Sequence, residues 1–272
     1  MTNIFFIRNK ASMERMYQGS EGGPSLEIER NVARIRLNRP DRHNRFEPAD
    51  IETMSAMLGN LALRTQARVL IVTARGQSFS SGFDLETLSG PRARECTAAF
   101  AALCDRIETM PIPTVCGING NVYGGATDIA LACDFRIGVQ GCRLQMSPAR
   151  LGIQYYHSGL RRYVERLGLT EAKRLFLTGE QVDTATMLRI GFLSEVSPSE
   201  ELEARLSAIA DALAQRSPKS LRGLKASLNA IARGLDDASA IDASFFESLA
   251  SSDAKEGLNA WSERRPAKFA DA

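Results

Sequence analysis

Two short apolar runs constrain the fold of this chain more than any other feature. Residues 69–72 and 113–118 are almost continuously apolar, which is typical of strands that are covered on both faces. Around them, apolar residues recur at helical spacing, as in Ile51, Met54 and Leu58. Buried strands that alternate with amphipathic helices predict a mixed α/β core.

The chain divides into three parts. Residues 1–24 end in a Gly-Ser-Glu-Gly-Gly-Pro run, and we predict that they form a flexible N-terminal extension. Residues 25–200 hold the alternating strands and helices and form the predicted core. Residues 201–272 are mostly helical in pattern, with Ser217 and Pro218 at the start of one predicted helix. We therefore predict a helical C-terminal region.

Composition limits the classes of function. Of 272 residues, 44% are apolar, so the chain can bury a sizeable core, and the formal net charge is only +2. This balance gives no reason to expect nucleic acid or a membrane as a partner, and no apolar run approaches the roughly 20 residues of a spanning helix. The five cysteines show no CxxC spacing, which indicates reduced thiols, no metal site and a cytoplasmic protein.

Two glycine-containing segments follow directly after predicted strands. Residues 79–85 read FSSGFDL, and residues 117–128 read GINGNVYGGATD. Where a strand ends and a helix begins, backbone N–H groups are left unpaired, and two such groups aimed at one point would form an oxyanion hole. Each segment alone also fits an ordinary turn, and neither matches a nucleotide-phosphate motif.

Several ordered motifs resemble the crotonase (enoyl-CoA hydratase/isomerase) superfamily over about residues 26–269. They are IRLNRPDRHN, VLIVTARGQSFSSGFDL, PIPTVCGINGNVYGGATDIALACDFRI, RLGLTEAKRLFLTGEQVDTATMLRIGFLSEV and EGLNAWSERRPAKF. The resemblance implies a crotonase-like spiral of ββα units with a helical C-terminal region, an acyl-CoA substrate, and no metal or cofactor beyond the coenzyme A of the substrate. It also implies a homotrimer or a dimer of trimers, in which residues 201–272 serve oligomerisation or cover the site.

By motif position, the resemblance implies that the N–H groups of Phe83 and Gly125 form the oxyanion hole for a thioester enolate. Asp128 falls where hydratases of the family usually carry a glutamate, and it is a candidate acid or base, or simply a charge at a helix start. The second carboxylate position holds Pro148, which can neither accept a proton nor orient a water. Hydration needs acid–base work at both carbons of the double bond, so we expect isomerisation, decarboxylation or another enolate reaction instead.

The segment that follows Gly152 departs further from the family. It carries Tyr155, Tyr156 and His157, where the family often has a glycine-rich stretch. Tyr155 and His157 are candidate catalytic groups beside Asp128, because both can donate hydrogen bonds and histidine exchanges protons near neutral pH. Packing at a helix start explains them equally well. The arrangement is similar to the methylmalonyl-CoA decarboxylase branch of the family, so an acyl-CoA decarboxylase is one alternative. The missing carboxylate at Pro148 makes a non-catalytic acyl-CoA-binding protein the other.

By resemblance, six residues are expected to contact the acyl group or coenzyme A. Ser81, Gly82, Asp84 and Gly124 lie in the two glycine-containing segments, and Arg42 and Pro148 lie outside them.

Overall fold

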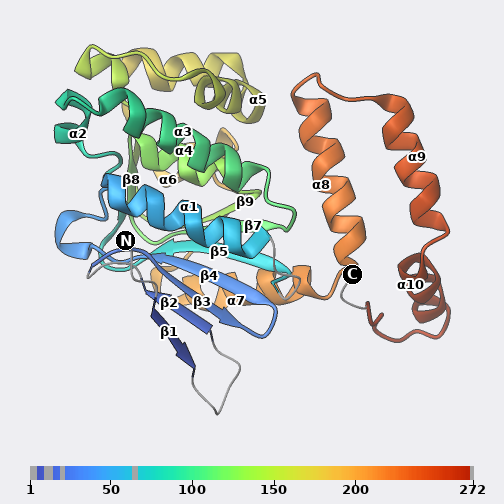
Figure 1. Ribbon diagram of the computed structural model, residues 1–272. Helices are drawn as coiled ribbons and strands as arrows, with labels where there is room; N and C mark the ends of the chain where they lie inside the picture. Colours follow the sequence, from blue (N-terminus) through green and yellow to red (C-terminus); the bar gives the residue numbers. More distant parts are fainter. Residues whose placement is uncertain (1–4, 9–14, 19–21, 63–66, 270–272) are drawn as a thin grey trace.

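A parallel sheet forms the centre of the chain. The computed structural model describes residues 5–8, 15–18, 22–62 and 67–269 (Figure 1). The parallel strands are, in spatial order, β4 (Val32–Leu37), β5 (Val69–Ala74), β7 (Thr114–Ile118), β9 (Phe135–Val139) and β12 (Glu195–Ser197). Every residue of β5 and β7 is buried, which confirms the strands predicted from their apolar runs.

Antiparallel strands continue this sheet beyond β4. They are β3 (Ser25–Glu29), β2 (Arg15–Gln18) and β1 (Phe5–Arg8), which pair in that order. Two of these strands fall in the predicted N-terminal extension, so part of that segment pairs with the sheet. The flexibility predicted for residues 1–24 and the boundaries at residues 24 and 200 stay predictions.

A second, smaller sheet carries the loops of interest. Its strands, in spatial order, are β11 (Gln181–Val182), β10 (Leu144–Gln145), β8 (Asn121–Tyr123) and β6 (Ser78–Ser80). Strands β6 and β8 are parallel, with Ser80 beside Val122. Because parallel strands end at the same edge, this pairing brings the two glycine-containing segments together.

Helices cover both faces of the large sheet (Figure 1). On one side lie α1 (Pro48–Ala62), α3 (Ala93–Glu108), α4 (Gly125–Ala132) and α5 (His157–Lys173). On the other side, α7 (Leu202–Ala214) packs against β5, β7 and β9. The shorter helical segments are η1 (Pro40–Arg42), α2 (Leu85–Ser89), η2 (Pro148–Leu151), η3 (Arg174–Thr178), α6 (Thr184–Arg189) and η4 (Ser199–Glu201).

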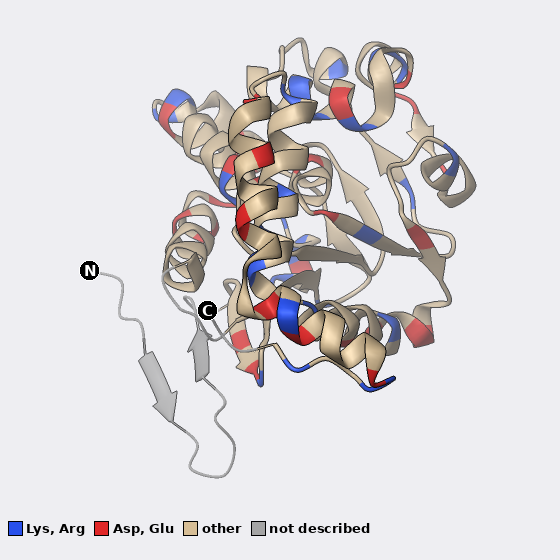
Figure 2. Cartoon of the chain, turned by 90° about the vertical axis from the view of Figure 1, so that its right-hand side faces the viewer, with Lys and Arg blue, Asp and Glu red and all other residues tan. Residues whose placement is uncertain are grey.

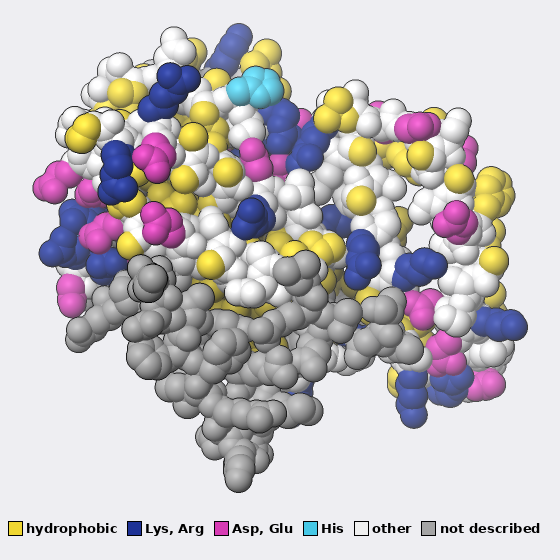
Figure 3. Space-filling view, viewed as in Figure 1, with side chains coloured by type: hydrophobic (Ala, Val, Ile, Leu, Met, Phe, Trp, Pro, Cys, Tyr) yellow, Lys and Arg dark blue, Asp and Glu magenta, His cyan; other side chains and the backbone are white. Residues whose placement is uncertain are grey.

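The C-terminal helices form an arm beside this body: α8 (Pro218–Ala232), α9 (Ala238–Leu249) and α10 (Ser252–Ser262) (Figure 1). Figure 3 shows a hollow between the arm and the body. The arm bonds to the body through polar groups, including Lys225 with Asp134 at 2.8 Å and Arg233 with Glu108 at 2.6 Å. Large apolar side chains of the arm stay exposed, and Trp261 is 82% exposed. The predicted helical C-terminal region is confirmed, while its role in oligomerisation stays a prediction.

Three smaller expectations can be compared with the structure. All five cysteines are free and buried, as predicted. Charges of both signs are interspersed over the face seen in Figure 2, in line with the small net charge. Within the described ranges, no helix combines the length and the apolar character that crossing a membrane requires.

Candidate active site

The first glycine-containing loop pairs with the turn that follows η1. The Phe46 N–H donates to the Gly82 carbonyl at 2.8 Å, and the Asp84 N–H donates to the Phe46 carbonyl at 3.0 Å. Phe46 and Phe83 therefore face each other as in a parallel bridge. Phe83 lies between Gly82 and Asp84, the two residues that bond to Phe46. In a parallel bridge such a residue directs its own N–H away from the partner strand, so the Phe83 N–H points away from Phe46.

Asn44 holds this loop in place. Its side-chain amide donates to the carbonyls of Arg75 at 2.8 Å and Ser78 at 2.9 Å, and its side-chain oxygen accepts from the Arg39 N–H at 2.8 Å. The Ser80 hydroxyl donates to the Asn44 carbonyl at 2.7 Å. Asn44 adopts a left-handed conformation with φ of 51°, which asparagine tolerates better than most residues. The turn therefore fixes the position of the first loop.

The second loop meets the first at Gly125. Helix α4 begins at Gly125, and the N–H groups of a helix's first turn have no partner within the helix. A Cβ atom added at Gly82 would lie 3.2 Å from the Gly125 nitrogen, and one added at Gly125 would lie 3.7 Å from the Phe83 Cβ. In the described part of the chain, neither the Phe83 nor the Gly125 N–H makes a turn or loop hydrogen bond. The two amides thus lie side by side and are free to bind an oxygen.

Asp128 lies one turn along α4 and is fully buried. Arg162 Nη1 lies 2.5 Å from Asp128 Oδ1, and the Tyr156 hydroxyl donates to Asp128 Oδ2. Both carboxylate oxygens are therefore bound by neighbouring side chains. Asp128 is the carboxylate among the predicted catalytic residues, and the structure places it in an ion pair.

Arg162 is itself fully buried among carboxylates. Besides Asp128, its guanidinium lies 2.7 Å from Asp105 Oδ1 and 3.3 Å from Glu108 Oε1. Burial alone would lower the pKa of Arg162, but Asp128 and the other anionic neighbours raise it above its ordinary value. Burial alone would likewise raise the pKa of Glu108, but Arg162 and then Arg161 lower it. Arg162 and Glu108 therefore both stay charged at neutral pH.

Tyr155 and Tyr156 form a stacked pair with ring centroids 4.3 Å apart. The Tyr155 hydroxyl donates to the Tyr156 hydroxyl at 3.3 Å, and the Tyr156 hydroxyl lies 3.5 Å from Cys104 Sγ. Burial, and then neighbouring groups that include Asp128, raise the pKa of both tyrosines, so both remain neutral phenols. Of the predicted catalytic residues, Asp128 bonds to Tyr155 only through Tyr156, and His157 is exposed at the start of α5.

Phe100 packs against both residues whose amides face the site. A Cβ at Gly125 would lie 3.0 Å from the Phe100 ring, which also makes an edge contact with Phe83 at a centroid distance of 5.4 Å. Gly125 and Asp128 are separated by three residues of α4, a rise of about 4.5 Å. Asp128, which accepts from the Tyr156 hydroxyl, is therefore one helical turn from Gly125.

The residues predicted to contact coenzyme A occupy varied places. Pro148 is buried as the first residue of η2, and Gly82 and Gly124 lie in the two loops. Asp84 caps α2 through the Thr87 N–H at 3.1 Å and lies 3.3 Å from Arg45, so it has a structural use of its own. Ser81 is exposed, and the Arg42 side chain is 57% exposed, 3.8 Å from Glu47.

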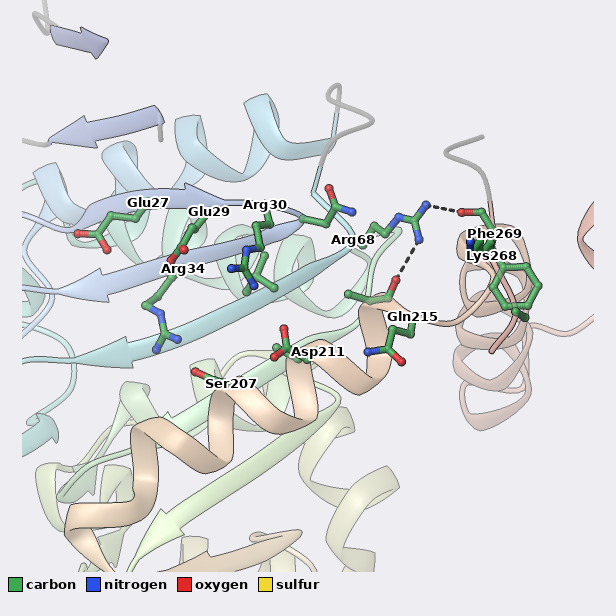
Figure 4. Close-up of a pocket in the computed structure, with 15 residues that line it drawn as sticks. Glu27, Glu29, Arg30, Arg34, Arg68, Ser207, Asp211, Gln215, Lys268 and Phe269 are labelled. Carbon is green, nitrogen blue, oxygen red and sulfur yellow. Dashed lines mark hydrogen bonds between the residues drawn. The ribbon is translucent and has the colours of Figure 1, made fainter. Parts of the chain in front are cut away.

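A separate hollow of about 630 Å³ lies beside α7 (Figure 4). Charges of both signs line it, including Glu29, Arg34 and Asp211. Arg68 joins α7 to the C-terminal segment there, because it donates to the carbonyls of Ala214 at 3.0 Å and Phe269 at 2.9 Å. None of the predicted site residues lines this hollow.

Comparison with known proteins gives the family. The model of the family described as enoyl-CoA hydratase/isomerase matches residues 27–272. The chain belongs to this family. It is 30% identical to a crotonyl-CoA hydratase of Syntrophomonas wolfei over 90% of this chain and 96% of that protein. It is also 30% identical to a putative enoyl-CoA hydratase of Thermus thermophilus, over 88% of this chain and 97% of that protein.

Solved structures support the same assignment. The chain matches an enoyl-CoA hydratase of Bacillus anthracis with a TM-score of 0.86 and 26% identity, over 92% of this chain and 99% of that one. It matches DspI of Pseudomonas aeruginosa with a TM-score of 0.85 and 28% identity, over 91% and 96%. The predicted enoyl-CoA hydratase/isomerase fold is confirmed, whereas the resemblance to the decarboxylase branch stays a prediction.

The family motifs indicate neither Arg162 nor Tyr156 as a partner of Asp128. A signal for Arg162 existed. On α5 the buried side includes Gly159, Tyr163 and Leu167, and Arg162 falls on that same side at helical spacing. Since a buried arginine requires ionic partners, this position predicts an internal ion pair.

Proposed function

We propose that this member of the enoyl-CoA hydratase/isomerase family acts on an acyl-CoA thioester and stabilises its enolate. The N–H groups of Phe83 and Gly125 bind the thioester carbonyl oxygen as negative charge develops on it. The observation that carries the proposal is the contact of the two loops at Gly82 and Gly125, with neither the Phe83 nor the Gly125 amide bonded within the described residues. The printed names of relatives such as crotonyl-CoA hydratase support the choice of substrate class. Coenzyme A enters as part of the substrate.

We further propose that hydration is slow in this protein, although many relatives carry the name hydratase. Activation of a water requires a free base that accepts its proton. Pro148 supplies none, and both oxygens of Asp128 are occupied by Arg162 and Tyr156. The site retains its enolate-stabilising amides and lacks a free carboxylate at both family positions.

Decarboxylation is the second candidate, favoured by this lack of a free carboxylate. In a 2-carboxyacyl-CoA, the bond from the α-carbon to the carboxylate breaks, carbon dioxide leaves, and the electron pair stays in the thioester enolate. The enolate then takes a proton from water or from a hydroxyl group. No base is needed to start this reaction, and Asp128, which accepts from the Tyr156 hydroxyl, lies one helical turn from Gly125.

Three assays on the purified protein test these proposals. They are hydration of crotonyl-CoA, exchange of the α-protons of butyryl-CoA with deuterium oxide, and decarboxylation of malonyl-CoA and methylmalonyl-CoA. We expect exchange or decarboxylation to exceed hydration. Hydration at the rate of a two-carboxylate enzyme, lost in Asp128→Asn, would overturn the view that hydration is slow. Acyl-CoA binding without turnover or exchange would indicate the non-catalytic alternative.

A pair of variants tests the oxyanion hole itself. Gly125→Pro removes the N–H at a first-turn position where proline is tolerated, and Gly125→Ala is the matched control that adds a Cβ and keeps the N–H. Loss of one donor costs about 2.7–4 kcal/mol, or about 10²–10³-fold in rate. We therefore expect Gly125→Pro to be slower than Gly125→Ala by that factor, and equal rates would refute the role of this amide.

A further inference from the structure

We infer that Arg162 and Asp128 are positioning residues that orient the Tyr156 hydroxyl, and that Asp128 is not a general base. The inference rests on the proposed acyl-CoA function for its kinetic consequences only. Its structural part, that Asp128 acts through Tyr156, is independent of the reaction.

The geometry leaves Asp128 no free oxygen. Oδ1 lies 2.5 Å from the Arg162 guanidinium and Oδ2 accepts from the Tyr156 hydroxyl. A proton taken from a substrate would have to displace one of these two bonds in a fully buried place. Asp128 is therefore built to anchor its two partners.

Arg162 is held in place from several sides. Asp105 Oδ1 lies 2.7 Å from Nη2, and Glu108 Oε1 lies 3.3 Å from Nε. Glu108 is in turn 2.7 Å from Arg161 and 2.6 Å from Arg233. A guanidinium that is bound by carboxylates from α3 and α4 cannot swing away to release Asp128. The ion pair is thus a fixed part of the site.

Tyr156 carries this order to Tyr155. Its hydroxyl is anchored on Asp128, and its ring stacks on Tyr155 at a centroid distance of 4.3 Å. The Tyr155 hydroxyl is bonded only to Tyr156, at 3.3 Å, in the described part of the chain. A bond of that length is weaker than the usual O–H···O distance of about 2.7–2.8 Å, so Tyr155 can exchange it for an acceptor on a ligand. Asp128 and Arg162 fix the position of the two tyrosines, and the Tyr155 hydroxyl is the group offered to a ligand.

A double-mutant cycle separates an anchor from a base. The variants are Asp128→Asn, Tyr156→Phe and their combination, measured as kcat and KM on the substrate that the wild type converts fastest. If Asp128 acts through Tyr156, each single change lowers kcat about tenfold and the double variant loses about tenfold, not about a hundredfold. Loss of a general base costs about 10²–10⁴-fold. Such a loss in Asp128→Asn with a near-normal Tyr156→Phe would overturn the inference.

The pH dependence of kcat gives a second readout. If Asp128 only orients Tyr156, the wild type and Asp128→Asn have acid-side profiles of the same shape. A wild-type rate that falls as one carboxyl group is protonated, with no residual rate in Asp128→Asn, would identify Asp128 as the base.

A measurement without turnover tests the structural part alone. Tyrosine labelled with ¹³C at Cζ reports the Tyr156 hydroxyl by NMR, and Tyr156→Phe assigns its signal. We expect Asp128→Asn to shift that signal and Asp105→Asn, which removes a different partner of Arg162, to leave it unchanged. Equal shifts of the Tyr156 signal in the two variants, or no shift in either, would refute the role of Asp128 as the anchor of the Tyr156 hydroxyl. If this measurement succeeds and no acyl-CoA assay shows turnover, then the proposed function fails while the anchor stands.

Discussion

Substitution of Gly82 by alanine should disable the site through the backbone. Gly82 has φ of +94°, and an added Cβ would lie 2.6 Å from the Tyr123 carbonyl oxygen and 3.2 Å from the Gly125 nitrogen. An ordinary contact between carbon and a carbonyl oxygen is about 3.3 Å or longer. The first loop must therefore move by about 0.7 Å relative to the second, which is the direction that separates the two amides.

The magnitudes follow from these distances. A left-handed conformation costs an L-residue about 1–2 kcal/mol, and the contact with Tyr123 adds to this cost, so we expect Gly82→Ala to lose about 2–3 kcal/mol of unfolding free energy. A displacement near 1 Å can reduce an enzymatic rate about 10²-fold. We therefore expect kcat/KM to fall by about that factor.

Gly141→Ala is the matched control. Gly141 has φ of +80°, and in the described part of the chain nothing lies within 4 Å of the Cβ it would gain. It carries the conformational cost of about 1–2 kcal/mol without the contact between loops. Urea denaturation measures stability for both variants, and turnover or α-proton exchange measures the site.

The comparison has a clear refuting result. If Gly82→Ala and Gly141→Ala lose stability and keep the wild-type rate alike, the approach of the two loops is irrelevant to catalysis. The proposed oxyanion hole would then lose its main support.

Two further changes test the surroundings of the site. Asn44→Ala removes three hydrogen bonds, each worth about 0.5–1.5 kcal/mol. We expect urea denaturation to show a loss of about 2–4 kcal/mol of unfolding free energy. A loss below about 0.5 kcal/mol would contradict the role of Asn44 in holding the first loop. Arginines including Arg162 hold the pKa of Glu108 below its ordinary value of 4.5. The ion pairs of Glu108 therefore stabilise the fold fully above pH 4.5, and this stabilisation is lost as the pH falls through the pKa of the folded state. We expect the unfolding free energy of the wild type to decrease below about pH 4.5 more steeply than that of Glu108→Gln, and parallel curves would exclude this linkage.

Long elements were predictable from the sequence because their patterns are long. The helix with Ile51, Met54 and Leu58 on one face is α1, and the run at residues 69–72 is the buried strand β5. Strands β8 and β10 are only three and two residues long, too short for any periodicity to be recognised. The small sheet that joins the two loops was therefore not predicted, although the loops were.

The site was predictable in its backbone and less so in its side chains. Phe83 and Gly125 were identified by motif position, and the structure places them side by side. The partners of Asp128 come from the start of α5 and from its interior, 28 and 34 residues away along the chain. Which side chain reaches a carboxylate over such a separation depends on how α5 crosses α4, and this crossing is a property of tertiary packing that local patterns do not encode.

The internal ion pair also limits how this chain can evolve. A descendant with two working carboxylates would need a new acid in place of Pro148 and the release of Asp128 from Arg162. Loss of Arg162 alone leaves buried carboxylates without their partner, at a cost of about 3–5 kcal/mol. This is a large share of the roughly 5–15 kcal/mol by which a folded protein is stable. Mutational routes that begin at Arg162 therefore pass through poorly folded intermediates, which restricts the order in which these two changes can be made.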